Sequence, residues 1–188
     1  MKVVLKGVRL AFPDLWVAKE FEAGDGKFRY NATYLVEPGS DNDKAIQAAI
    51  GEVAKETYGA KASAMLESLR GNANKYCYLK GDLKEYDGFA GMLYLSTHRN
   101  QGQGAPKVVD KDPKVDLLAS SGKPYAGCYV NATVDIYAQK GQYPGIRASM
   151  IAVQFAKDGD AFAGTPASAD DFEDLSDGAD SDEFASMV

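Results

Sequence analysis

The sequence predicts a mainly β domain of the α+β class, followed by an acidic C-terminal tail. Five segments rich in β-branched and aromatic residues are bounded by Gly, Pro and Asn clusters, as strands are, and two amphipathic stretches have helical spacing. A chain of 188 residues can bury one real core but is too short for two ordinary domains and a linker. One or two helices are therefore expected beside a single sheet.

The first strands are predicted at residues 2–12 and 29–36. In the first, apolar residues alternate with Lys6 and Arg9, and Pro13 is expected to end it because proline cannot donate to a sheet ladder. The second, RYNATYLV, is followed by Glu-Pro-Gly, a turn signal.

A helix is predicted over residues 41–57 and a second, shorter one up to Gly71. Ser40 followed by Asp43 resembles a capping box, and Ile46, Ile50 and Val53 repeat at helical spacing. These apolar stripes are interpreted as core packing against the sheet.

Three further strands are expected at residues 91–99, 127–139 and 146–155. In the middle one, Cys128 to Ile136 at every second position form one face, so Tyr129 and Tyr137 lie on the other, less buried face. Residues 100–125 form a long Gly-, Lys- and Pro-rich connection of the kind that is often functional.

Charge is distributed unevenly along the chain. Ten acids and no Lys or Arg follow Lys157, while the 17 acids before that point are outnumbered by 21 basic residues, a formal charge of +4. This asymmetry indicates a nucleic-acid-binding domain at residues 1–157 and an interaction tail at 158–188. Because apolar residues are sparse in the tail, it is predicted to be disordered.

Enzymatic functions have little support in the sequence. His98 is the only histidine and lacks a nucleophile-elbow pattern, and the folded part shows no convincing acidic metal cluster. Cys77 and Cys128 are interpreted as buried thiols instead of a disulfide or zinc site. We expect no enzyme activity, cofactor or metal. Without an apolar spanning segment or signal peptide, the protein is expected in the cytoplasm, away from membranes.

Aromatic rings beside basic residues form the strongest functional signal. Unpaired bases stack on flat rings while cations follow the phosphates, so single-stranded DNA is the expected ligand and duplex DNA is left open as a second one. Any one of these tyrosines can instead be a packing residue of a half-buried strand. The candidate DNA-binding residues are Arg29, Lys75, Tyr76, Tyr94, Arg99, Lys107, Lys111, Lys123, Tyr125, Tyr129, Tyr137 and Arg147.

Five stretches, taken in order, resemble the small single-stranded DNA-binding proteins of tailed bacteriophages. They are residues 2–16, 27–41, 124–139, 145–164 and 168–175, the last reading SADDFEDL. The resemblance implies an OB-fold-like five-stranded barrel with a helix at one end, a DNA groove across the sheet, and a role in phage DNA replication, recombination or repair, in the host cell cytoplasm.

The tail is expected to compete with DNA for the basic domain and to recruit replication or recombination proteins. Other single-strand binders often end in an acidic run with a terminal Phe, whereas Ala-Ser-Met-Val follow Phe184 here, so the family's docking mode is not transferred in detail. Two alternatives stay open: a phage structural or interaction protein without nucleic-acid binding, and a nuclease or recombination enzyme. The candidate partner-binding residues are Asp171, Phe172, Asp174, Leu175, Asp182, Glu183 and Phe184.

Overall fold

Seven strands and two α-helices make up the part of the chain that the computed structural model describes, residues 1–20 and 26–162. The helices are α1 (Asp41–Tyr58) and α2 (Ala62–Leu69), with short 3-10 turns at Gly59–Lys61, Gly81–Leu83, Gln101–Gln103 and Ala119–Ser121. The strands are β1 (Lys2–Glu20), β2 (Phe28–Val36), β3 (Tyr78–Lys80), β4 (Leu93–Asn100), β5 (Lys107–Val109), β6 (Tyr129–Gln139) and β7 (Gly145–Lys157).

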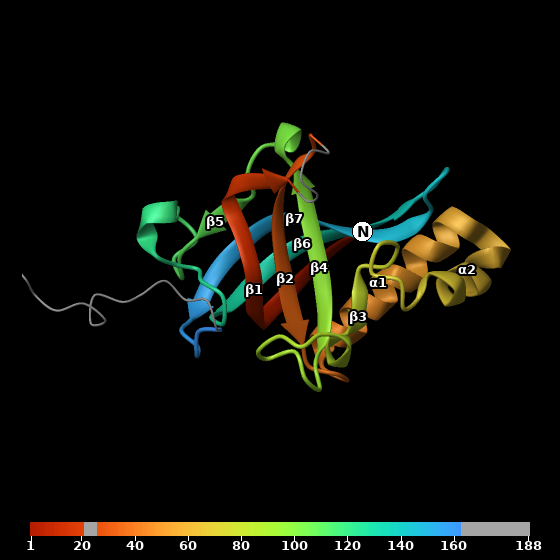
Figure 1. Cartoon of the computed structure of the whole chain (residues 1–188), viewed down its shortest axis with the longest axis horizontal. Coiled ribbons are helices and arrows are strands. Elements are labelled where there is room, and N and C mark those ends of the chain that lie inside the picture. Colours follow the sequence, from red (N-terminus) through yellow and green to blue (C-terminus); the bar gives the residue numbers. More distant parts are fainter. Residues whose placement is uncertain (21–25, 163–188) are drawn as a thin grey trace, which may run out of the picture.

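Five of the strands close into a barrel, which confirms the predicted fold class. The sheet order is β3-β4-β2-β1-β6-β7-β5, and a parallel bridge between His98 of β4 and Ser149 of β7 joins the two sides. The ring of β1, β2, β4, β7 and β6 is a five-stranded OB-like barrel. The short strands β3 and β5 pair on its outside, and the helices lie at the end of the molecule away from β5 (Figure 1).

The prediction that Pro13 ends the first strand is wrong, because β1 continues to Glu20. Its pairing with β2 shifts register between Ala11 and Asp14, and Phe12 has a φ of 50°. Pro13 thus falls in a bulge, where the strand needs no donor for the ladder. The first half of β1, up to Arg9, pairs with β6, and the second half, from Arg9 onward, pairs with β2.

The barrel core follows the two-residue period of the strands. Val130, Val134 and Ile136 of β6 are fully buried, whereas Tyr129 and Tyr137 on the opposite face are partly exposed. The predicted faces of this strand are confirmed, as is the burial of both cysteines.

The start of α1 confirms the predicted cap at Ser40. Its Oγ accepts a hydrogen bond from the Asp43 backbone N–H at 3.2 Å. The buried Asp43 carboxylate in turn accepts bonds from the Gly39 N–H at 2.8 Å, the Gln47 side chain at 2.7 Å and the Tyr78 hydroxyl at 2.9 Å. This carboxylate therefore joins α1 to β3.

Two short strands escaped prediction. The three-residue strand β3 follows α2, and β5 lies within the long connection, where a run of three residues gives no measurable periodicity. No helix in residues 1–20 and 26–162 has the length and apolar character needed to cross a membrane.

Replacing Asp43 by Ala should lower the free energy of unfolding by about 2 kcal/mol, because it leaves buried donors without an acceptor. Urea unfolding measures the change, with Asp41→Ala as a control because the Asp41 side chain is exposed. The control should stay within about 0.5 kcal/mol of the unaltered chain. Equal stability of the two variants would contradict the proposed role of Asp43.

The same carboxylate makes stability depend on pH. Desolvation would raise the pKa of Asp43, but hydrogen bonds from Gln47, Gly39 and Tyr78 outweigh it, so the folded-state pKa lies below the usual 3.8. The advantage of Asp over Asn at position 43 should therefore be present above pH 3.8 and shrink as the pH falls below it. Unfolding of the Asp43→Asn variant at pH 7 and pH 3 tests this, and a pH-independent difference would count against it.

Candidate nucleic-acid interface

A groove of about 760 Å³ runs over the outer faces of β2 and β4. The end of the β6–β7 hairpin and the segments around residues 73–77 and 84–89 form its walls. We call it the basic groove. Its charged and aromatic lining consists of Lys27, Arg29, Lys84, Arg147, His98, Phe12, Tyr86, Phe89, Tyr94, Tyr137 and Tyr143.

Strand alternation and register place polar side chains along the groove floor. Every second residue of β2 faces outward, and cross-strand pairs join Arg29 to Asn100, Asn31 to His98, and Thr33 to Ser96. Paired residues of an antiparallel sheet lie on the same face, so both strands contribute to one polar surface. Tyr94, Ser96 and His98 of β4 all line the groove, as alternate residues of one strand face do.

The charged side chains that line the basic groove are positive. Four cationic side chains line it, and no Asp or Glu does within the described residues. Burial, followed by the positive charges of Arg29 and Arg147, lowers the pKa of His98 to about 4. The Tyr137 hydroxyl lies 3.3 Å from Nε2 of this histidine. The groove is thus suited to a polyanion, and His98 is neutral in it at pH 7.

Three exposed rings of the groove were missed by sequence reasoning. The exposed fraction is 49% for Phe12, 51% for Tyr86 and 65% for Tyr143. Phe12 and Tyr86 meet edge to face with ring centroids 4.9 Å apart, and Phe12 is the one non-glycine residue with positive φ in the described chain. Tyr86 and Tyr143 lie in loops, where no hydrophobic period marks them. The positive φ of Phe12 is a strained conformation of the kind that is common at functional sites.

Some predicted residues do meet in this groove. Arg29, Arg147, Tyr94 and Tyr137 line it, although Tyr94 is only 4% exposed. Lys75 is exposed, and its carbonyl accepts a bond from the Ile146 N–H at 2.8 Å, which places it beside the groove residue Arg147. Arg29, Arg147 and Tyr137 are therefore the predicted residues that the structure brings together in the groove without burying them.

Two other predicted residues do not present their side chains to the basic groove. Tyr76 is 6% exposed, too little for a ring face to receive a base. The Arg99 side chain belongs to the opposite face of β4, where Nε and Nη2 donate to the carbonyls of Gly104 and Gln103, each at 2.8 Å. Strand alternation thus turns Arg99 away from the basic groove, so it does not join the predicted residues that line it.

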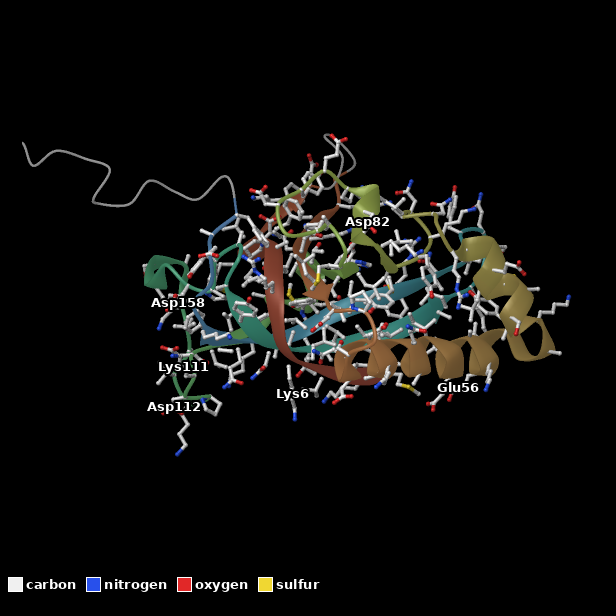
Figure 2. All side chains as sticks on the ribbon, turned by 90° about the horizontal axis from the view of Figure 1, so that it is seen from below. Lys6, Glu56, Asp82, Lys111, Asp112 and Asp158 are labelled. Carbon is white, nitrogen blue, oxygen red and sulfur yellow. The ribbon has the colours of Figure 1, made fainter. Side chains whose placement is uncertain are left out.

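The remaining candidates lie elsewhere on the barrel. Lys107 pairs with Asp116, and Lys123 pairs with Asp110 at 3.0 Å, both on the β5 side. Lys111 lies with them, at the opposite end of the molecule from Glu56 on α1 (Figure 2).

Tyr125 and Tyr129 lie near the end of the described chain. The Tyr125 hydroxyl donates to Asp158 at 2.9 Å, and Lys157 lies over the Tyr129 ring at 4.5 Å. The candidate partner-binding residues of the tail, from Asp171 to Phe184, lie outside the described residues.

Comparison with known proteins identifies related phage proteins. A family model described as the ssDNA-binding protein of Enterobacter phage Enc34 matches residues 1–185. Protein p50 of Acyrthosiphon pisum secondary endosymbiont phage 1 is 43% identical over 180 residues, which cover 94% of this chain and 95% of p50.

Two solved structures share the fold. The single-stranded DNA-binding protein of bacteriophage Enc34, solved in complex with ssDNA, matches with a TM-score of 0.68 and 21% identity, over 85% of this chain and 88% of its own. The single-stranded DNA-binding protein gp2.5 of bacteriophage T7 matches with a TM-score of 0.52 and 12% identity, over 97% of each chain.

The pKa of His98 depends on the positive charges of the basic groove. Because His98 is the chain's only histidine, its NMR signals are assigned without ambiguity. Its imidazole should titrate with a pKa of about 4. Arg147→Gln should raise this pKa by removing one of two positive neighbours, while Lys111→Gln on the β5 side should leave it unchanged. A pKa near 6.5 in the unaltered chain would contradict the described groove.

Proposed function

Because the chain belongs to the family of the ssDNA-binding protein of Enterobacter phage Enc34, we propose that it binds single-stranded DNA in the basic groove. The observation that carries the proposal is the groove's lining, with four cations, exposed rings and no carboxylate among the described residues. In OB folds, the face of the second and third barrel strands is a common oligonucleotide-binding surface. Here that face belongs to β2 and β4.

Each kind of side chain has a separate task in this proposal. Arg29, Arg147 and the neighbouring lysines neutralise phosphates, which supplies affinity without reading sequence. Tyr86, Tyr137 and Tyr143 offer ring faces for stacking, and every base has such a face. Binding is therefore tolerant of sequence. It favours single strands because the faces of paired bases are covered in a duplex.

The biological role follows from the family and its phage members. A sequence-tolerant single-strand binder protects and organises the exposed strands of replication, recombination and repair, and this chain acts there without catalysis, in the cytoplasm of a phage-infected cell. A phage interaction protein without DNA binding is the competing function. It is distinguished by the absence of any complex with oligo(dT).

The acidic tail has a part in the same proposal. Residues 163–188 hold eight carboxylates and no cation, and they follow Phe162, whose ring lies 4.4 Å from the guanidinium carbon of Arg9. A tethered polyanion acts at an effective concentration on the order of millimolar, so it competes with phosphates for the groove. DNA binding then releases the tail for replication or recombination proteins.

Arg147→Gln should weaken binding of fluorescent oligo(dT) about tenfold, or about 1.4 kcal/mol. One lost phosphate contact should also reduce the slope of log affinity against log salt by roughly 0.7. Anisotropy titrations at two salt concentrations measure both effects. Lys111→Gln removes the same charge on the β5 side and should change affinity less than about twofold.

Tyr143→Ala should also weaken binding about tenfold, because stacking contributes ~1–3 kcal/mol per base. Tyr143→Phe keeps the ring and should bind as the unaltered chain does. A matched duplex should bind more weakly than oligo(dT). Equal effects of Arg147→Gln and Lys111→Gln would reject the basic groove as the site, and no oligo(dT) complex at low salt would reject the function.

Removing residues 163–188 should tighten oligo(dT) binding several-fold at low salt, with the gain fading as salt screens the carboxylates. Ending the chain after Phe162 keeps that ring on the barrel. The control is a full-length chain whose eight tail acids are replaced by Asn or Gln, which separates charge from length. If the chain with the neutral tail binds oligo(dT) as the unaltered chain does, the tail acids do not compete with DNA for the groove.

A further inference from the structure

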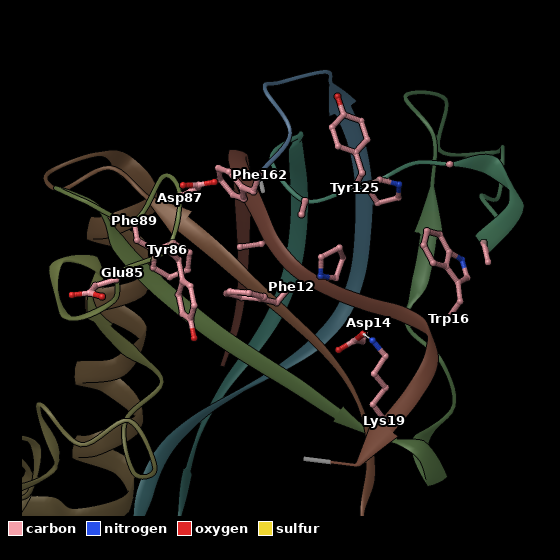
Figure 3. A pocket seen from close by; sticks show the side chains of 16 residues that line it. Phe12, Asp14, Trp16, Lys19, Glu85, Tyr86, Asp87, Phe89, Tyr125 and Phe162 are labelled. Atoms are coloured by element: carbon pink, nitrogen blue, oxygen red, sulfur yellow. Dashed lines mark ion pairs between the residues drawn. The ribbon is translucent and has the colours of Figure 1, made fainter. Parts of the chain in front are cut away.

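A second hollow, of about 640 Å³, lies beside the basic groove (Figure 3). Its walls come from β1, from residues 85–89, from residues 119–126 and from Phe162. We call it the aromatic pocket because six rings line it, those of Phe12, Trp16, Tyr86, Phe89, Tyr125 and Phe162.

Apolar surface extends beyond the rim of the aromatic pocket. The Trp16 indole N–H donates to the Leu117 carbonyl at 3.2 Å, which holds the 117–126 loop against β1. The residues that follow these two in sequence, Val17 and Leu118, are 67% and 64% exposed. Exposed large apolar side chains near a hollow are a feature of protein-binding surfaces.

The charge of this pocket is opposite to that of the basic groove. Asp14, Glu85 and Asp87 line it, and Lys19, the one cation lining it among the described residues, is paired with Asp14. One loop separates the two sites: Lys84 lines the groove, whereas its neighbour Glu85 lines the pocket. A phosphate backbone is thus favoured on one side of this loop and repelled on the other.

The sequence that follows Phe162 is acidic. Phe162 lines the pocket, and the residues after it carry eight carboxylates in sequence. A cationic ligand is therefore attracted to the chain in general as well as to the pocket.

We propose that the aromatic pocket docks a basic segment of a protein partner, one with an aromatic or aliphatic anchor flanked by lysines or arginines. The anchor packs among Trp16, Tyr125 and Phe12, and the flanking cations meet Glu85 and Asp87. Because the pocket and the groove share Phe12, Tyr86 and Phe89, the partner is held directly beside the bound strand. The docking proposal does not require DNA binding, although the two surfaces share these three rings.

The test uses the full chain and three labelled peptides. The first has a central Trp-Leu pair with two lysines on each side, the second replaces Trp-Leu by Gly-Gly, and the third replaces the lysines by glutamates. The first peptide should bind at least about tenfold more tightly than either of the others, because only it supplies both the anchor and the complementary charge.

Glu85→Lys should weaken binding of the Trp-Leu lysine peptide about tenfold. Glu67→Lys makes the same charge change on the exposed surface of α2, and should have little effect. Leu118→Ala should weaken binding of this peptide and not that of the Gly-Gly peptide. These comparisons separate the pocket from general attraction to the acidic tail.

Equal effects of Glu85→Lys and Glu67→Lys, or equal binding of the glutamate peptide, would overturn the proposal. Oligo(dT) affinity of Arg147→Gln is measured in parallel. This affinity depends on the basic groove alone, so a failure of the DNA-binding proposal is distinguished from a failure of the docking proposal.

Discussion

The barrel depends on one strand that pairs on both sides. The first half of β1 pairs with β6 and the second half with β2, and the bend between them occurs where Gly7 and Phe12 have positive φ. Without that bend the sheet would stay open, and β4 could not reach β7 at the bridge between His98 and Ser149. Closure puts the outer faces of β2 and β4 next to the β6–β7 hairpin, which creates the basic groove from four strands.

Separation of charge follows from the same geometry. The loop after β3 crosses the barrel surface with Lys84 toward the groove and Glu85 toward the aromatic pocket, while Tyr86 and Phe89 serve both. Two neighbouring surfaces of opposite charge allow the protein to hold an anionic strand and a cationic partner side by side. A net charge of −6 for the whole chain conceals this arrangement.

Sequence reasoning predicted what has a local period or a local chemical cause. The two faces of residues 129–137 follow from strand alternation, and the start of α1 follows from the capping side chain of Ser40. It failed where no local period exists: a bulge keeps Pro13 inside a strand, and the turn after β4 supplies the carbonyls that hold Arg99. Composition identified cations and rings but not their positions, so Lys111 was included while the loop residues Tyr86 and Tyr143 were missed.

The central claim is that unpaired bases lie against the outer face of β2 and β4, between the rings of the groove. Photocrosslinking of the full chain to an oligonucleotide that carries 5-iodouracil, followed by peptide mass spectrometry, tests this contact directly. If DNA binds in the basic groove, crosslinks should form at Tyr86, Tyr137 or Tyr143, which line it. Crosslinks confined to Tyr125, Tyr129 or Trp16, which lie outside that groove, would contradict it.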